Sequence, residues 1–244
     1  MRGPMDNPFL KVDGIGKHFG GVVALKDVSF SVERGEIVGL MGPNGAGKTT
    51  LLNIIAGEYS PDSGKIIFNG HDITGHPSYK SGRLGIARTY QIPQPFVTLS
   101  VLDHLRVSSV FGKRHGKNPQ EVDFDRILEL ADLTNKKNTL AEELPTLSLK
   151  KLELARALAG DPELLLLDEV AAGMTEAEIP KILDTIKAIR QNGKTIILVE
   201  HVMKVMVNAV DRIVVLDKGT KLCEGNKDSV INDCRVIDAY FGTS

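Results

Sequence analysis

The stretch that decides the fold reads Gly42-Pro43-Asn44-Gly45-Ala46-Gly47-Lys48-Thr49. It fills every fixed position of the pattern G-x-x-x-x-G-K-S/T, in which glycines let the backbone bend around a phosphate chain. Residues 36–41 before it form a short apolar run, and residues 48–56 after it have helical composition and end at Gly57. The sequence therefore predicts a strand, a phosphate-binding loop and a helix, in that order.

The ligands of this loop follow from its backbone amides and its last residues. Successive N–H groups point at the anion, and the following helix presents its positive end to it. We expect Lys48 to meet the β- and γ-phosphates and the Thr49 hydroxyl to hold Mg²⁺, and we include Thr50 among the nucleotide-binding residues. A glycine-rich turn that binds nothing would not require lysine and threonine there. The loop alone does not distinguish ATPases from GTPases, kinases and helicases.

Two carboxylates follow a second apolar run. Residues 164–167 are all leucine, and Asp168 and Glu169 come directly after them. We expect this run to be a buried parallel strand, whose carboxyl end is where open α/β sheets keep their ligand sites. Asp168 is then predicted to bind Mg²⁺ through water, and Glu169 to polarise the water that attacks the γ-phosphate. A polar strand end would explain Asp168 alone, but two adjacent acids are less common.

Two further polar residues are candidates for the same site. His201 follows the apolar run 195–199 and is expected to hydrogen-bond the γ-phosphate, although a single histidine is ordinarily a surface or core residue. Gln91 follows Arg88-Thr89-Tyr90, where a neutral amide reaches Mg²⁺ or water when its loop swings in. Lys48, Gln91, Glu169 and His201 are therefore the predicted catalytic residues, with Thr49, Gln91 and Asp168 as predicted metal ligands.

The rest of the chain predicts additions to this α/β core. Residues 10–33 and 64–70 favour a small antiparallel sheet, and 100–160 favour a helical insert. A hairpin is expected around 217–219, followed by a short tail. We predict one domain over residues 1–244, in which a core with a parallel sheet carries both subdomains.

A helix is expected between the two later parallel strands. Its apolar face consists of Ile179, Ile182, Leu183, Ile186 and Ile189. Thr175 and Glu178 match a capping box at its start, and Pro180 falls in the first turn, where proline is tolerated.

Composition excludes several classes of protein. The chain has 244 residues, 42% of them hydrophobic, and a formal net charge of −1, which favours a folded domain and gives no reason to expect a nucleic-acid partner. Cys223 and Cys234 lack metal-site spacing, which fits a reducing cytoplasm. The apolar runs are far shorter than the ~20 residues of a membrane-spanning helix, and residues 1–8 lack the pattern of a secretory signal. We expect a cytoplasmic protein that reaches a membrane only through a partner.

The phosphate-binding loop, Gln91, the acidic pair and His201 occur in the order and spacing of ABC-transporter ATPase subunits, which the sequence resembles over nearly its full length. The resemblance implies ATP and Mg²⁺ as ligands and a P-loop NTPase fold of the ABC type. It also implies integral membrane permease subunits and a second ATPase subunit, identical or different, as partners, and a peripheral position on the inner face of the cell membrane. Phe19 matches the aromatic residue that stacks on adenine; its alternative role is that of a half-buried strand residue. Residues 88–91 and 236–242 look like the subgroup that powers branched-chain amino-acid importers.

One family motif departs from the pattern. The signature L-S-G-G-Q should lie just before the helix that leads to the acidic strand, and the chain offers Leu147-Ser148-Leu149-Lys150-Lys151. In the family this motif contacts the ATP held by the opposite subunit, so Ser148 is retained as a nucleotide-binding candidate, although Leu149 and Lys150 add bulk. We expect Ser148 to cap the helix, and Lys150 and Lys151 either to attract a phosphate or simply to be solvated. Thr175 likewise replaces an acid in the loop 171–175. A homodimer is therefore expected to hydrolyse ATP slowly.

Two other functions are considered. A soluble ABC ATPase that acts on nucleic acid or ribosomes, or regulates without transport, would often carry two cassettes or basic insertions, and neither is present. A GTPase is disfavoured because residues 226–228 lack the N-K-x-D spacing for guanine. The cargo and the direction of transport depend on residues of other subunits.

Overall fold

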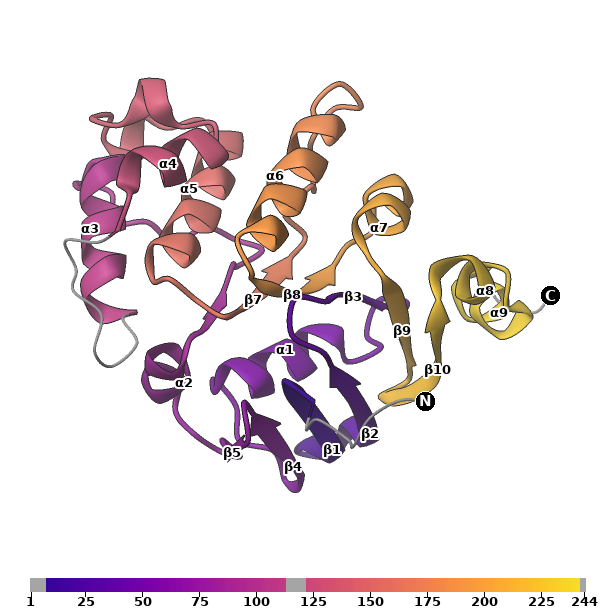
Figure 1. Cartoon of the computed structure of the whole chain (residues 1–244). Helices are drawn as coiled ribbons and strands as arrows, with labels where there is room; N and C mark the ends of the chain where they lie inside the picture. The colour runs from indigo at the N-terminus through magenta and orange to yellow at the C-terminus, as the bar shows by residue number, and fades with distance from the viewer. Residues whose placement is uncertain (1–7, 113–121, 242–244) are drawn as a thin grey trace, which may run out of the picture.

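A four-stranded antiparallel sheet forms one side of the molecule (Figure 1). The computed structural model describes residues 8–112 and 122–241. The sheet has the order β2-β1-β4-β5, formed by β1 (Leu10–Phe19), β2 (Val22–Val32), β4 (Ser63–Phe68) and β5 (His71–Asp72). Alternate apolar residues of β1 and β2 are buried, as the period-2 pattern requires. The predicted antiparallel sheet is confirmed.

A six-stranded sheet forms the core, with the order β10-β9-β3-β8-β7-β6. Its strands are β3 (Ile37–Met41), β6 (Ile86–Arg88), β7 (Leu164–Asp168), β8 (Thr195–Val199), β9 (Arg212–Asp217) and β10 (Thr220–Asn226). The pairs are parallel except β9 with β10. Every residue of β3, β7 and β8 is buried, because helices or the second sheet cover both faces, and this explains their continuous apolar runs.

The β9–β10 hairpin turns at Lys218 and Gly219, whose φ values of 45° and 79° are those of a tight hairpin turn. The predicted hairpin is therefore confirmed at its expected position.

Helices cover the two faces of the core sheet. Helix α1 (Lys48–Ala56) lies between the two sheets and shares one apolar cluster with both (Figure 1). Helices α6 (Ile179–Gln191) and α7 (Met203–Ala209) pack on the opposite face, and α2 (Ser78–Leu84) leads into β6. Helix α1 has the predicted bounds, including Gly57 as its C-cap.

The start of α6 confirms only half of the predicted capping box. Both the backbone N–H and the hydroxyl of Thr175 donate to Glu178, but the helix begins at Ile179 and no side chain caps it. Its apolar face is as predicted, with Leu183 half-buried, and Pro180 lies in the first turn.

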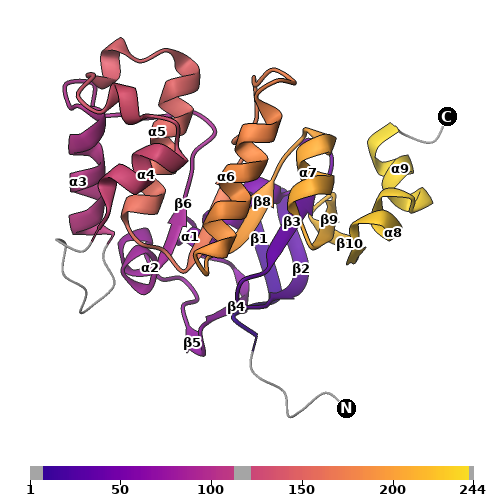
Figure 2. The same ribbon diagram turned by 45° about the horizontal axis from the view of Figure 1, so that its top comes forward.

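The helical insert has an apolar core of its own. It comprises α3 (Val101–Phe111), α4 (Phe124–Leu130), the short 3-10 helices η2 (Thr134–Lys136) and η3 (Ala141–Glu143), and α5 (Thr146–Ala159). In Figure 2 these elements stand to the left of α6 and α7. The expected tail folds into α8 (Lys227–Ile231) and α9 (Cys234–Phe241). Within the described ranges, no helix is long and apolar enough to cross a membrane.

Candidate active site

The phosphate-binding loop runs from the end of β3 into α1 and is tightly folded. Gly42 has a φ of 147°, and a Cβ atom there would lie 2.1 Å from the carbonyl oxygen of Leu216, so only glycine fits. The buried Lys48 Nζ donates to the carbonyl oxygens of Gly42 (2.7 Å) and Pro43 (2.9 Å). Burial lowers the pKa of Lys48, whereas the charges of Glu169 and Asp168 raise it. The predicted acids therefore lie close enough to this loop to act on its lysine.

Asp168 ends β7 and is only 3% exposed. Its Oδ2 lies 2.9 Å from Nη2 of Arg88, and its backbone N–H donates to the Thr89 hydroxyl (3.0 Å). Burial raises the pKa of Asp168, and the hydrogen bond and charge of Arg88 oppose this shift. The carboxylate is thus fixed by an arginine from the neighbouring strand.

Glu169 turns away from the strand and meets both remaining catalytic candidates. Its φ is 52°, and its N–H donates to the Val199 carbonyl (2.9 Å). Gln91 Nε2 donates to Glu169 Oε2 (2.5 Å), and His201 Nε2 lies 2.9 Å from Glu169 Oε1. Two residues predicted from separate segments, Gln91 and His201, therefore converge on the carboxylate of a third, Glu169.

Arg88 is a residue of this site whose role sequence reasoning missed. Its nearly buried guanidinium contacts Asp168, Asn53 and Glu58, and the Tyr90 hydroxyl donates to Glu58 (2.7 Å). Arg88 lies three residues before Gln91 in the sequence, but of these two residues only Gln91 was predicted to have a function. A basic residue at the end of a strand beside an expected acidic strand end was the available signal.

Glu200 was missed for a similar reason. It follows β8, is 3% exposed, and accepts a hydrogen bond from the Ala171 N–H (2.6 Å). Burial raises the pKa of Glu200, while hydrogen bonds from the amides of Ala171, Val202 and His201 lower it. This carboxyl therefore connects the loop after β7 to the segment that carries His201.

The available donors fit Mg²⁺. The Thr49 hydroxyl, the Asp168 carboxylate and the Gln91 carbonyl oxygen are the hard oxygen ligands that this ion prefers. Gln91 uses its nitrogen for Glu169, which leaves its oxygen for the metal, whereas one Asp168 oxygen is already paired with Arg88. In the part of the chain that the structure describes, no group of three or more His, Cys, Asp or Glu side chains could hold a metal ion.

Phe19 is accessible at the end of β1. The side chain is 43% exposed, and its ring meets that of Tyr59 edge to face at a centroid distance of 5.3 Å. Lys17 Nζ lies 5.5 Å from the centroid of the Phe19 ring. An exposed aromatic ring is compatible with the predicted stacking on a base.

The signature stretch lies elsewhere in its helix than predicted. Helix α5 begins at Thr146 with Pro145 at the N-cap, so 147–151 lie inside the helix, and the prediction that Ser148 caps it was wrong. Ser148 is buried, and its hydroxyl accepts a hydrogen bond from Lys136 Nζ (2.6 Å). This burial argues against Ser148 as a contact for nucleotide on a second chain.

Lys150 and Lys151 are not simply solvated. Lys150 Nζ donates to the Ala172 carbonyl (2.7 Å), and Lys151 Nζ lies 2.7 Å from Asp132 Oδ2. Both ammonium groups therefore have partners within the chain and are neither free in solvent nor in the first turn of α5.

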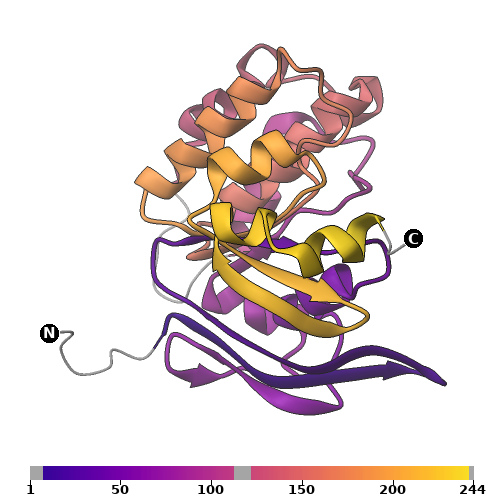
Figure 3. The same cartoon turned by 90° about the vertical axis from the view of Figure 1, so that its right-hand side faces the viewer.

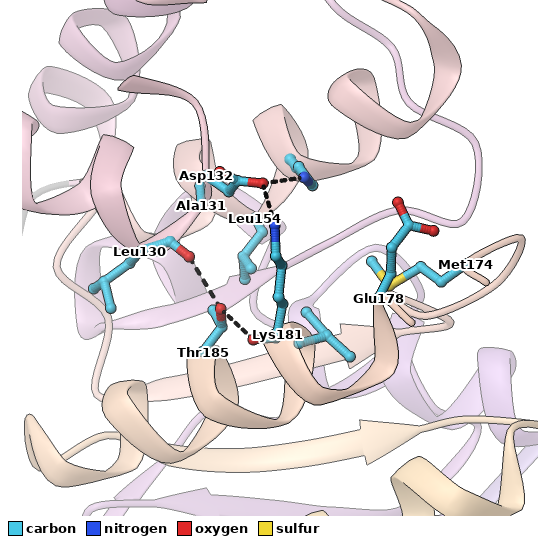
Figure 4. A pocket seen from close by; sticks show the side chains of 10 residues that line it. Leu130, Ala131, Asp132, Leu154, Met174, Glu178, Lys181 and Thr185 are labelled. Carbon is cyan, nitrogen blue, oxygen red and sulfur yellow. Dashed lines mark hydrogen bonds and ion pairs between the residues drawn. The ribbon is translucent and has the colours of Figure 1, made fainter. Parts of the chain in front are cut away.

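Asp132 belongs to a small pocket between the helical insert and α6 (Figure 4). Lys181 Nζ approaches the same carboxylate at 3.9 Å, and the Thr185 hydroxyl donates to the Leu130 carbonyl at 3.1 Å. Together with the Lys150 contact, these interactions connect the insert to the core near the loop after β7.

Known proteins share this sequence and this fold. A family model described as ABC transporter matches residues 25–172. The chain belongs to the ABC transporter family. It is an ABC-type ATPase, a class that binds and hydrolyses ATP.

Named members of the family match nearly the whole chain. The probable branched-chain amino acid transport ATP-binding protein LivG of Archaeoglobus fulgidus is 35% identical, covering 96% of this chain and 95% of the relative. The high-affinity branched-chain amino acid transport ATP-binding protein LivG of Salmonella typhimurium is 36% identical, covering 98% and 99%.

Solved ABC structures have the same fold. The ADP conformation of MJ1267, an ATP-binding cassette of an ABC transporter, has a TM-score of 0.85 at 30% identity and covers 98% of this chain and 100% of its own. A dimeric post-hydrolysis state of the cassette MJ0796 with ADP and Pi has a TM-score of 0.79 at 25% identity, with coverages of 89% and 98%. The predicted α/β ABC ATPase fold is confirmed.

Proposed function

We propose that this ABC ATPase powers a membrane transporter for branched-chain amino acids, from a peripheral position on the cytoplasmic face of the membrane. The convergence of Gln91 and His201 on Glu169, beside the phosphate-binding loop, carries the ATP-hydrolysing part of this proposal. The cargo is inferred from the names of relatives that match nearly the whole chain.

The reaction begins with Lys48. Its ammonium leaves the carbonyl oxygens of Gly42 and Pro43 for the β- and γ-phosphates of ATP, which the loop amides and the start of α1 also bind. Phe19 stacks on the adenine. Thr49, Gln91 and Asp168 would hold Mg²⁺ when it is bound, and the ion would then supply neutralisation of charge on the phosphates.

Glu169 acts as the general base. Its carboxylate accepts the proton of a water that Gln91 and His201 orient, and the water oxygen attacks the γ-phosphorus while the β–γ bridging bond breaks. Lys48 and His201 stabilise the charge that develops on the transferred phosphoryl group. The geometry around Glu169 supports this role because both orienting side chains already contact its oxygens.

The membrane partner docks between the Gln91 loop and the helical insert. A groove there is lined by Tyr90 and Phe96 of the loop, by Phe111 of α3 and by Arg156 of α5. These three aromatic side chains are 45%, 53% and 75% exposed, respectively, which is an unusual grouping for a surface without a partner. A cytoplasmic segment of a permease with an apolar face fits this surface. Movement of the Gln91 loop would then transmit nucleotide binding to the membrane subunit.

A second ATPase chain completes the assembly, and we propose that a homodimer hydrolyses ATP slowly. The Ser148 hydroxyl already accepts a hydrogen bond from Lys136 Nζ. The exposed residues at the start of α5 are Pro145 and Thr146 instead. A different partner with an intact signature would then restore one of the two sites. Brisk, cooperative turnover by the purified homodimer would count against this proposal.

Transport itself is tested by reconstitution. The chain is purified with the membrane proteins that accompany it and incorporated into vesicles, and ATP-dependent uptake of leucine is measured against the same complex with Glu169→Gln. We expect uptake only with the unmodified chain. Purification without any integral membrane protein, with normal ATP hydrolysis, would instead support a soluble role.

A further inference from the structure

The C-terminal helix α9 reaches the first residue of the phosphate-binding loop. The backbone N–H of Gly42 donates a hydrogen bond to the hydroxyl of Tyr240 at 2.8 Å, although the two residues lie 198 positions apart. Figure 3 looks onto the side of the molecule that carries α8 and α9. The nucleotide site therefore includes a contact from the far end of the described chain.

The hydrogen bond acts on a residue that is already constrained. A Cβ at Gly42 would clash with the carbonyl oxygen of Leu216, and the Gly42 carbonyl accepts a hydrogen bond from Lys48 Nζ. Its N–H and its C=O are thus both engaged, the N–H by a side chain from outside the loop and the C=O by the lysine that binds phosphate. When Lys48 moves to ATP, Tyr240 remains as the hydrogen-bond partner of Gly42.

Helix α9 is itself anchored, so the hydroxyl is held in place. Val236, one turn before Tyr240, is buried in the apolar cluster that includes α6, α7 and β9, and α9 packs against α8 and β10. Tyr240 is a little over one-third exposed, and burial raises the pKa of its hydroxyl further above the ordinary value of 10.0, so the group is neutral. A neutral hydroxyl on an anchored helix is a stable acceptor for one amide.

We propose that Tyr240 is a positioning residue for nucleotide binding, whose hydroxyl holds Gly42 so that the amides after it are arranged for phosphate before ATP arrives. The inference rests on the nucleotide-binding function of this loop. Without the hydroxyl, the partly buried N–H of Gly42 loses its partner and the loop samples other conformations. ATP must then order the loop as it binds, which lowers the affinity.

The test compares Tyr240→Phe with Tyr79→Phe, a matched change at an exposed tyrosine of α2. Phenylalanine keeps the ring of Tyr240 and removes only the acceptor. We measure the Kd for ADP and ATP by calorimetry on the full chain, and KM and kcat for ATP. We expect Kd and KM to rise about threefold to tenfold in Tyr240→Phe, the effect of one hydrogen bond, with kcat within about twofold. Tyr79→Phe should match the unmodified protein.

A purely structural role gives a different result. In that case Tyr240→Phe lowers the melting temperature of the nucleotide-free protein but leaves Kd and KM unchanged, and the inference is wrong. Failure of the unmodified protein to bind either nucleotide would refute the proposed function itself, which keeps the two failures distinct.

Discussion

Arg88 and Asp168 form a buried ion pair in which Nη2 lies 2.9 Å from Oδ2. Arg88 ends β6, and Asp168 ends the adjacent parallel strand β7. The ion pair therefore lies at the carboxyl ends of the parallel strands, where the candidate site lies. The hydroxyl of the next residue, Thr89, accepts a hydrogen bond from the backbone N–H of Asp168. The loop that carries Gln91 therefore starts from a point fixed to the predicted metal ligand.

Breaking this pair is expected to destabilise the fold. Arg88→Met leaves Asp168 as an unpaired buried carboxylate, and the free energy of unfolding should fall by about 3–5 kcal/mol, measured by urea denaturation of the nucleotide-free protein. The double variant Arg88→Met with Asp168→Leu should recover a large part of this loss, because it leaves no charge unpaired. If the single variant proved as stable as the unmodified protein, the pair would contribute nothing to the fold.

Glu169→Gln is expected to separate binding from hydrolysis. Glutamine keeps contacts with Gln91 and His201 but cannot accept the proton of water, so turnover should fall about 10²- to 10⁴-fold while the Kd for ATP stays unchanged. Steady-state phosphate release and calorimetry measure the two quantities. Glu176→Gln, at an exposed acid in the following loop, is the control and should keep full activity. Normal turnover in Glu169→Gln would refute its assignment as the base.

Glu200 should give stability a pH dependence of known sign. Burial raises the pKa of this carboxyl above its ordinary value of 4.5, so at a pH between the unfolded and the folded pKa the native state binds the proton more strongly than the unfolded chain. The resulting stabilisation is complete below the unfolded pKa and is lost as the pH rises through the folded pKa. Glu200→Gln keeps an oxygen for the Ala171 N–H and cannot titrate.

The stability of Glu200→Gln relative to the unmodified protein should therefore increase between about pH 5 and about pH 8. Urea unfolding of both proteins at the two pH values measures this difference and cancels the titration of other groups. A difference that is constant with pH would show that Glu200 has the same pKa in both states.

Lys150→Met should loosen the contact between the helical insert and the loop after β7. The lost hydrogen bond to Ala172 is partly exposed, so we expect a loss of about 1 kcal/mol, or about 2–4 °C in Tm for a chain of this size. Lys187→Met, at an exposed lysine of α6, is the matched control and should change Tm by less. Equal melting temperatures for both variants would mean that the Lys150 contact does not stabilise the protein.

The parts of the fold predicted from sequence are those decided by neighbouring residues. The runs at 164–167 and 195–199 were recognisable as buried strands because their apolar character is continuous, and Asp168 and His201 follow as their strand-end residues. Helix α1 was bounded by Gly47 and Gly57, whose positive φ values suit glycine at both ends.

The start of α5 and the long-range contacts were not predictable in the same way. Ser148 is a good N-cap residue, but Pro145, three residues before it, supplies an extended backbone at the N-cap, and the helix begins at Thr146. The contacts of Lys150 with Ala172 and of Tyr240 with Gly42 join segments that only tertiary packing brings together. No local pattern reports which distant side chain a loop will meet.

The left-handed backbone of Glu169 has a consequence for how this protein responds to selection. A residue with a Cβ in that conformation is strained by about 1–2 kcal/mol, whereas glycine would adopt it freely. Screening variants only for thermal stability would therefore favour glycine at position 169. The most stable variants from such a screen would be unable to hydrolyse ATP.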